Sequence, residues 1–370
     1  MAIRQIAIEG YRSIQQLALE FEQINIITGH NGSGKSNLYK AIHLLSRAVQ
    51  GQFSATLASE GGMPSIMWAG ENRKANFDKN KARLGLSVEL ENYSYSIACG
   101  FPPNIPPSMF ALDPEIKEEY VWHGHKKRPS TTILERIQNS AFITSQIGKK
   151  VAYPFCLNFS ESVLHQLKEP HLYPELTEVN LEMGSWRFYH NFRTDAYSLI
   201  RTPQTCTRTM VLADDGYNLA AALQTIIEIG DEDGLHAAID SAFPGAKLII
   251  IDPYGKAQFQ LGLNMPGILR SMMCSELSDG TLRYLCLVAA LLSPRPPSVM
   301  VLNEPEMSLH EDLIKPLAVL INDLSYNSQL IITTHSQQLI HYLTDINTQA
   351  RIVNLEMGSF GTQIKGYLED

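Results

Sequence analysis

The 370-residue chain has little of several features that would define its class at once. Its five cysteines include no C-x-x-C pair, which argues against zinc ribbons and disulfide frameworks. Its longest apolar stretch, Tyr284 to Leu292, is too short to cross a bilayer. The opening residues, MAIRQIAIEGYRSI, lack the apolar core of a signal peptide. We therefore expect a cytoplasmic protein with reduced thiols and no membrane association.

An excess of positive charge is also missing, because the formal net charge is −8. Any contact with nucleic acid must then come from a local patch. The short run HGHKKR at 123–128 could contact a nucleic-acid backbone, or it could be a solvated loop. With 44% hydrophobic and 18% charged residues, the composition is typical of a folded globular chain. Internal repeats and low-complexity tracts are absent from the sequence.

The most informative segment that is present is GHNGSGKS at 29–36, a full match to G-x-x-x-x-G-K-[ST]. A β-branched run precedes it at 24–27, and apolar residues at helical spacing follow it. A strand, a glycine-rich turn and a helix N-terminus together form an anion site, to which Lys35 adds a cation and Ser36 a hydroxyl for Mg²⁺. This predicts binding of a nucleoside triphosphate. The candidate nucleotide-binding residues are Gly29, Asn31, Gly32, Ser33, Gly34, Lys35, Ser36 and Asn37.

Four further segments follow one another in the last third of the chain. ELSDGT at 276–281 leads into a predicted helix, and VMVL at 299–302 is a buried strand that ends in Asn-Glu-Pro. EMSLH at 306–310 opens another helix, which is expected to run to about residue 324. A last strand at 329–334 ends in Thr-Thr-His-Ser.

The order of these motifs resembles that of ABC-type ATPases. The details LSDGTLR, NEPE-x-SLH and ITTHS, and the opening IEGYRSIQQLALEFEQINIITGHNGSGKSN, are similar to the RecF/SMC-like branch, which includes the OLD ATPases. The motifs cover roughly residues 1–50 and 270–340, and the middle matches only loosely. The resemblance implies an α/β P-loop fold of the ABC-head type. Its mostly parallel core sheet is flanked by helices, with an antiparallel β-rich lobe and an inserted α/β lobe.

The resemblance also implies roles for single residues. Glu304 would be the catalytic general base, although an acid before Pro305 can also be a simple turn residue. His335 would be the switch histidine that contacts the γ-phosphate, although a histidine at a strand end can also be structural. Ser278 and Gly280 open a helix whose N–H groups can bind phosphate.

Mg²⁺ would be held by Ser36 and, through a water, by Asn303. Relatives usually carry Asp at that position, and an amide oxygen accepts a hydrogen bond without supplying charge. Asn303 could therefore indicate a slow, switch-like ATPase, or it could be a tolerated variant.

Other positions are assigned less directly. Asp279 stands where transporter relatives have Gly, and we expect it to cap the helix because a carboxylate would repel phosphate. Arg12 would approach the nucleotide, while Tyr11 could stack on adenine or fill the core. For the Q-loop residue, Gln146 and the His190-Asn191 strand end both remain candidates.

The chain is expected to divide into three parts. Residues 1–70 and 201–370 would form the two halves of the ATPase head, and 71–200 a variable inserted lobe. Within them the patterns predict a hairpin at 83–101, a strand at 186–193, two helices over 217–240 broken at 230–231, and a strand at 247–251. Residues 130–143 and 160–168 have helical spacing without sustained heptads, so no long coiled coil is expected.

Two classes of function remain open. One is an ATP-hydrolysing head that uses ATP and Mg²⁺, dimerises around ATP and acts on or near DNA, in repair, recombination or phage defence. The other is an ATP-gated switch with slow turnover that recruits or restrains a separate effector protein. Only 35 residues follow His335, too few for the nuclease module of OLD relatives, so nuclease activity would belong to a partner. LSDGT in place of LSGGQ disfavours a transporter ATPase.

Overall fold

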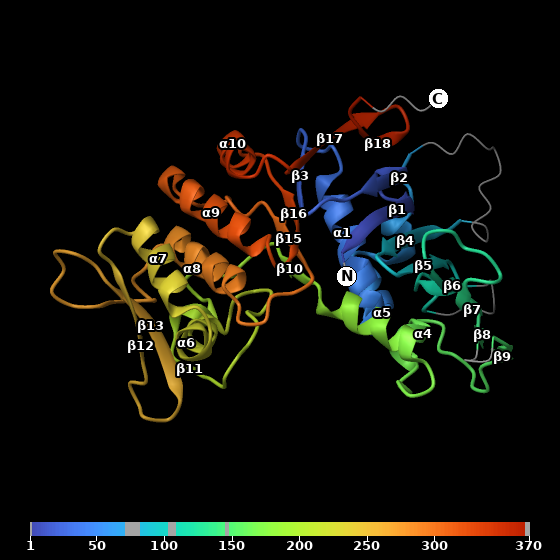
Figure 1. The fold of residues 1–370 in the computed structure, drawn as a ribbon, viewed down its shortest axis with the longest axis horizontal. Helices are drawn as coiled ribbons and strands as arrows, with labels where there is room; N and C mark the ends of the chain where they lie inside the picture. The colour runs from blue at the N-terminus through green and yellow to red at the C-terminus, as the bar shows by residue number, and fades with distance from the viewer. Residues whose placement is uncertain (1, 71–81, 103–108, 145–147, 367–370) are drawn as a thin grey trace. The chain divides into compact units, whose positions relative to one another are not determined.

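The computed structural model describes residues 2–70, 82–102, 109–144 and 148–366, and the order of its elements can be followed in Figure 1. The chain forms two compact units. The first consists of Met1–Glu22, Ile27–Trp186 and Ile352–Asp370. The second consists of Gln23–Ile26 and Arg187–Arg351. Strand β3, Ile24–Thr28, begins in the second unit and ends in the first.

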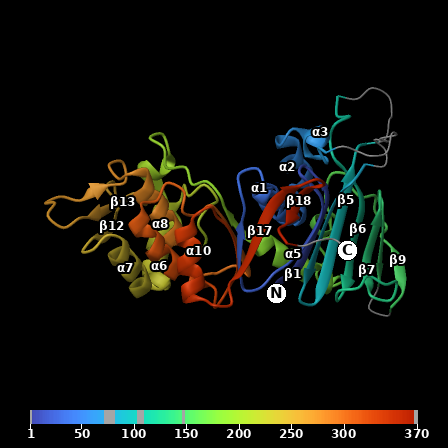
Figure 2. The same ribbon diagram turned by 90° about the horizontal axis from the view of Figure 1, so that it is seen from above.

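The first unit contains an antiparallel sheet with the strand order β17-β18-β2-β1-β4-β5-β6-β7-β8-β9. Figure 2 shows several of these strands side by side. Their bounds are β1 Ile3–Tyr11, β2 Ile14–Glu20, β4 Leu84–Leu90, β5 Tyr93–Gly100, β6 Glu115–His123, β7 Thr132–Ile137, β8 Ser140–Thr144, β9 Lys150–Ala152, β17 Arg351–Gly358 and β18 Gly361–Ile364.

Helices of the first unit cover one face of this sheet. Helix α1, Lys35–Val49, contacts β1 and β4, and it buries Leu38, Ile42 and Leu45 at i, i+4 and i+7. This spacing produces the apolar stripe that packs on the sheet. The other helices of this unit are α2 Phe53–Ser59, α3 Gly62–Ile66, α4 Val163–Gln166 and α5 Pro174–Ser185.

The predicted hairpin at 83–101 is confirmed, because β4 and β5 pair antiparallel around residues 91–92. The helical reading of 130–143 is wrong. These residues form strands β7 and β8, in which Leu134 pairs with Ile143, and Gln138 makes the turn at φ 53°. Ile133 and Ile143 are β-branched, and pairing with β6 outweighed a weak helical spacing. Of residues 160–168, only the four of α4 are helical.

The second unit contains a parallel sheet in which β15, Val299–Asn303, lies between β10, Arg187–Tyr189, and β16, Gln329–Thr333. Residues 23–26 lie beside β16, since Leu330 donates its N–H to the Gln23 carbonyl. All residues of β15 and β16 are buried. Of the strand predicted at 186–193, only residues 187–189 form a strand, whereas the mostly parallel core agrees with the sequence analysis.

Helices pack around this sheet, and a small antiparallel sheet joins them. The two helices predicted over 217–240 are confirmed as α6 Leu219–Ile229 and α7 Glu232–Ala242. The remaining elements are η1 Leu199–Arg201, β11 Gln204–Thr205, β12 Lys247–Ile251, β13 Gln258–Asn264, β14 Met272–Met273, α8 Asp279–Leu291, η2 Glu311–Leu313, α9 Ile314–Leu324 and α10 Gln337–Ile346.

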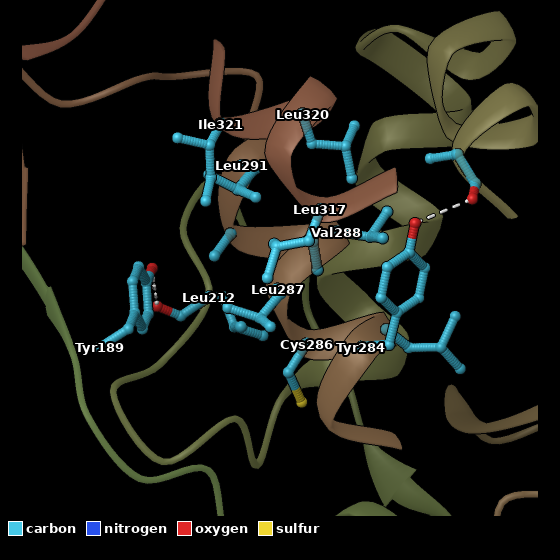
Figure 3. Packing of buried hydrophobic residues seen from close by; sticks show 14 of the residues in the cluster. Tyr189, Leu212, Tyr284, Cys286, Leu287, Val288, Leu291, Leu317, Leu320 and Ile321 are labelled. Atoms are coloured by element: carbon cyan, nitrogen blue, oxygen red, sulfur yellow. Dashed lines mark hydrogen bonds between the residues drawn. The ribbon is translucent and has the colours of Figure 1, made fainter. Parts of the chain in front are cut away.

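The core of the second unit is apolar, with tyrosine hydroxyls satisfied inside it (Figure 3). Tyr284 donates to the Ala238 carbonyl at 3.0 Å, and Tyr189 donates to the Leu212 carbonyl at 3.0 Å. Burial without such partners would cost stability. In the described part of the chain, no helix is both long and apolar enough to cross a membrane. The longest described helix has 15 residues, so no long coiled coil occurs there.

Candidate functional site

The C-terminal hairpin of the first unit, β17–β18, leaves no room for a side chain at two glycines of the P-loop, residues 29–36. Gly34 has φ 100° and caps α1 without a side-chain hydrogen bond. A Cβ atom on Gly34 would lie 2.0 Å from Thr362 Oγ1, and one on Gly29 would lie 2.2 Å from the Leu355 carbonyl oxygen. Any side chain at these two positions would displace the loop, so the hairpin β17–β18 fixes its path.

The loop 29–36 brings a cation and two hydroxyl groups to the N-terminus of α1. The Lys35 side chain is buried, and its ammonium group donates to the carbonyls of Gly29 at 2.7 Å and His30 at 3.1 Å. The buried hydroxyl of Ser33 has no hydrogen-bond partner within the protein. Ser36 is exposed at the start of α1, where its hydroxyl oxygen suits a hard cation such as Mg²⁺. These residues would hold the phosphates and their metal ion.

A polar network connects the P-loop helix with the turn between β1 and β2. Asn37 donates its side-chain amide to Ser13 Oγ at 2.7 Å, and Ser13 Oγ lies 2.8 Å from Thr362 Oγ1. The Thr362 N–H also donates to the Ser13 carbonyl at 2.7 Å. Sequence reasoning missed Thr362, because no local pattern indicates that this strand packs on the loop.

Arg12 and Tyr11 share one carboxylate. Glu60 Oε2 accepts from Arg12 at 2.7 Å and from Tyr11 at 2.9 Å, and its Oε1 lies 3.3 Å from Lys40 Nζ. Tyr11 is fully buried, and burial raises the pKa of its hydroxyl. Tyr11 therefore fills the core, and its stacking on adenine is ruled out. Arg12 is held at φ 48°, a conformation that costs energy for a residue other than glycine.

The end of β15 in the second unit carries a strained acid. Glu304 has φ 49°, and its N–H donates to the Thr333 carbonyl at 2.9 Å. Its Oε1 lies 3.1 Å from His335 Nε2, so the two candidate catalytic residues form a pair. Buried Arg283 donates to the Glu304 carbonyl at 3.2 Å. A non-glycine residue in this backbone region is costly and is found most often at functional sites.

Asn303 is held at both ends of its buried amide. Its Oδ1 accepts from Thr333 Oγ1 at 2.5 Å, and its Nδ2 donates to His190 Nδ1. An amide oxygen has two lone pairs, so one remains for a water. The His190 ring therefore contacts the end of β15, whereas the other Q-loop candidate, Gln146, lies outside the described residues.

Glu306 positions the loop that carries His335. Its Oε1 accepts from Thr334 Oγ1 at 2.6 Å, from the His335 N–H at 3.0 Å and from the Ser336 N–H at 3.2 Å. Sequence reasoning did not assign Glu306, although the second acid of N-E-P-E was a visible signal. The hydrogen bonds tie residues 306–310, which correspond to the D-loop of ABC-type ATPases, to the end of β16.

Residues 276–281, which correspond to the signature of ABC-type ATPases, lead into α8, but the cap of this helix differs from the expectation. Ser278 is the N-cap and accepts from the Thr281 N–H at 3.1 Å. The prediction that Asp279 caps the helix is wrong, because its Oδ1 pairs with the Arg201 guanidinium at 2.5 Å. The first-turn residue Gly280 lies against the D-loop, since a Cβ there would be 2.7 Å from the Ser308 carbonyl oxygen.

A cavity of about 630 Å³ lies at this helix N-terminus. Its polar lining joins the signature to the D-loop and comprises Ser278, Gly280, Thr281, Ser308, His310 and Asp312. Such a cavity, open at a helix N-terminus, can accept an anionic group. Among the described residues, no cluster of three His, Cys, Asp or Glu side chains could hold a metal ion by itself.

Comparisons with known proteins agree with this arrangement. A family model described as AAA ATPase domain matches residues 1–182. Another, an AAA domain whose description mentions the AbiEii toxin and a Type IV TA system, matches residues 161–341. The chain is 20% identical over 352 residues to an "ATP/GTP phosphatase" of Helicobacter pylori, covering 93% of this chain and 88% of that protein.

Other relatives match over a shorter length or in fold alone. The "DNA replication and repair protein RecF" of Lactococcus lactis is 28% identical over 95 residues, 25% of each chain. An SMC head bound to the C-winged helix domain of ScpA is 14% identical, with a TM-score of 0.56 over 98% of this chain and 97% of that one. A Pyrococcus furiosus SMC head bound to the C-terminal domain of ScpA gives 0.52, at 14% identity, over 98% and 95%.

The chain is a RecF/SMC-like ATPase head of the ABC type. It binds and hydrolyses ATP.

Proposed function

We propose that two copies of the chain enclose ATP, so that the P-loop of one copy meets Ser278 and Gly280 of the other. The observation that carries this proposal is the cavity at the N-terminus of α8, where the signature and the D-loop come together. A helix N-terminus attracts an anionic phosphate, so this cavity can receive the phosphate of a nucleotide. In ABC-type heads the signature acts on nucleotide held by a second subunit, which gives a two-fold symmetric dimer.

In this proposal each catalytic role falls on a named side chain. Lys35 would neutralise phosphate charge, and Ser36, with Asn303 through a water, would hold Mg²⁺. Glu304 takes a proton from the attacking water, and His335, paired with it at 3.1 Å, contacts the γ-phosphate. Arg12 adds a cation near the nucleotide once Glu60 releases it.

A test of the composite site is the concentration dependence of hydrolysis. If each site needs two chains, the specific ATPase activity should rise with protein concentration and level off when the dimer is saturated. Mixing the Lys35→Ala chain with the Ser278→Arg chain should restore part of the activity that each variant lacks alone, because each mixed dimer then has one site with an intact P-loop and an intact signature. A specific activity that stays constant over a thousandfold dilution would contradict the dimer.

We further propose that the head acts on DNA. Relatives named as RecF replication and repair proteins support this role. The basic run at 123–128 gives little support, since His125 pairs with Glu89 at 3.1 Å and Lys127 lies over the Tyr120 ring. The test is DNA binding with and without ATP across a salt series, in which binding to DNA phosphates weakens as salt rises. If the protein binds neither single- nor double-stranded DNA, with ATP or without it, this role is rejected.

The alternative is an ATP-gated switch that recruits an effector protein, and Asn303 favours it. The buried amide supplies no negative charge beside Mg²⁺ and is already engaged by Thr333 and His190. Turnover would then be slow, and the ATP-bound state long-lived. SMC head structures bound to ScpA domains show that relatives with this fold bind protein partners. A slow ATP turnover rate that equals the dissociation rate of the ATP-bound dimer would support the switch. Rapid turnover would reject it.

A further inference from the structure

Arg201 makes an unusual number of contacts with the segment before the signature helix. Its Nη1 donates to the carbonyls of Leu277 at 2.8 Å, Cys274 at 3.1 Å and Ser275 at 3.4 Å. Its Nη2 pairs with Asp279 Oδ1 at 2.5 Å. The Arg201 side chain is only 11% exposed, whereas the Asp279 carboxylate that it pairs with is 62% exposed.

The same guanidinium is anchored on its other side. Its Nε donates to the carbonyls of Thr194 at 2.9 Å and Asp195 at 3.2 Å. All three nitrogens of Arg201 are therefore engaged, and the planar group is fixed between two loops. The carbonyl oxygens of residues 274, 275 and 277 converge on this guanidinium, whose positive charge offsets their negative partial charges.

Asp279 makes this charge important for an anion. A carboxylate in the first turn stabilises a helix through its dipole, but it also repels a phosphate that approaches the same N-terminus. Pairing with Arg201 cancels the carboxylate charge. The N–H groups that follow Ser278 can then attract a phosphate, as the N-terminus of an uncharged helix does.

We propose that Arg201 is a positioning residue for the signature: it fixes the loop 274–278 and neutralises Asp279, so that Ser278 and Gly280 can receive the phosphate of the partner's nucleotide. This inference rests on the proposed ATP-sandwiched dimer. It assigns to residue 201, outside every motif of the sequence, a specific part in assembling that site.

The chain offers a matched control on the same loop. Arg270 forms an exposed pair with Glu276, with N–O distances of 2.8 Å and 2.6 Å, and its side chain is 69% exposed. Arg270→Gln removes the same charge from a pair whose acid, Glu276, lies two residues before Ser278. It leaves the carbonyls of Cys274 and Leu277 with their Arg201 contacts.

The experiment compares Arg201→Gln, Arg201→Lys, Asp279→Asn, the Arg201→Gln, Asp279→Asn double variant and Arg270→Gln, all on a Glu304→Gln background that retains ATP. The ATP-dependent dimer dissociation constant is measured by sedimentation, and the affinity of the monomer for a fluorescent ATP analogue by titration. Arg201→Gln should raise the dimer dissociation constant at least about tenfold. Nucleotide affinity should stay the same, and Arg270→Gln should change neither.

The double variant distinguishes charge from loop order. Adding Asp279→Asn to Arg201→Gln should recover part of the lost dimer affinity, because the uncompensated carboxylate is gone. Relative to Arg201→Gln, Arg201→Lys should recover less dimer affinity than the double variant does, since one ammonium cannot reach all the carbonyls that the guanidinium spans. Equal dimer affinity in Arg201→Gln and Arg270→Gln, with no effect of Asp279→Asn in the double variant, would overturn the proposal.

Hydrogen exchange separates failure of this inference from failure of the dimer. In the nucleotide-free monomer, Arg201→Gln should speed exchange at residues 274–281, and Arg270→Gln should not. If the Glu304→Gln parent never dimerises, the proposed function is wrong, and unchanged exchange in Arg201→Gln would then overturn the positioning role as well. A thermal melt of each variant shows that it is folded.

Discussion

Asn303→Asp is the substitution whose outcome can be worked out most fully from the structure. The side chain is buried, its Oδ1 accepts from Thr333, and its Nδ2 donates to His190 Nδ1. Aspartate keeps the shape and the Thr333 hydrogen bond. It replaces the donor that faces His190 with a second acceptor, and it places a carboxylate in a dry site.

Without Mg²⁺ the change should destabilise the fold by about 1–3 kcal/mol at pH 8, the usual cost of a buried group without its hydrogen bond. The pH dependence follows from His190. A carboxylate partner raises the pKa of the His190 imidazolium in the folded variant above the ordinary value of about 6.5. That stabilisation is present below pH 6.5 and is lost as the pH rises through the raised pKa. The penalty should therefore be smaller at pH 6 than at pH 8.

With Mg²⁺ present, Asn303→Asp should stabilise the fold instead of destabilising it. Because the new charge lies where Asn303 would act on the metal through a water, the variant should need less Mg²⁺ for half-maximal hydrolysis. The assay is thermal unfolding at pH 6 and pH 8, in apo, Mg²⁺ and ATP-Mg²⁺ buffers, with a Mg²⁺ titration of ATPase activity. Asn327→Asp, at an exposed position, is the control. Superimposable melts and Mg²⁺ curves for parent and variant would refute this reasoning.

Three further predictions concern the first unit. Lys35→Ala should abolish ATP binding at micromolar nucleotide, because the phosphate charge loses its cation, and unchanged affinity in a titration of folded variant would contradict the P-loop assignment. Gly34→Ala should lower the free energy of unfolding by about 1–3 kcal/mol, because residue 34 has φ 100° and the new Cβ atom would clash with Thr362. In thermal melts, adding Thr362→Gly should relieve only the clash. Burial, with Arg47 nearby, lowers the pKa of His43 to about 4. Since the unfolded ring titrates near 6.5, stability should fall as the pH drops from about 6.5 to about 4, and His43→Gln should flatten that slope in a pH series of melts.

Local sequence carries much of this structure because several elements depend on neighbouring residues. The P-loop pattern needs specific residues over one turn, and the strands at 299–302 and 329–333 each contain a short apolar run with β-branched residues. Both features can be read without knowing the fold. The turn at residues 91–92 likewise defines its own hairpin.

Non-local contacts could not be read from the sequence. Thr362 lies 328 residues after Gly34, and no pattern links them. Asp279 looked like a helix cap because its partner, Arg201, is 78 residues away. Residues 130–143 have ambiguous spacing, and pairing with β6 decided their structure. In each case the deciding interaction came from a distant segment.

The measurement that tests the central claim most directly is the mass of the Glu304→Gln variant by size-exclusion chromatography with light scattering. Glutamine removes the proposed base but keeps the side-chain shape, so ATP should accumulate. With ATP-Mg²⁺ the account predicts twice the 41.3 kDa of one chain. With ADP-Mg²⁺, or after adding Ser278→Arg to block the signature, it predicts the monomer. A monomer under every condition, or a dimer indifferent to both nucleotide and Ser278, would contradict it.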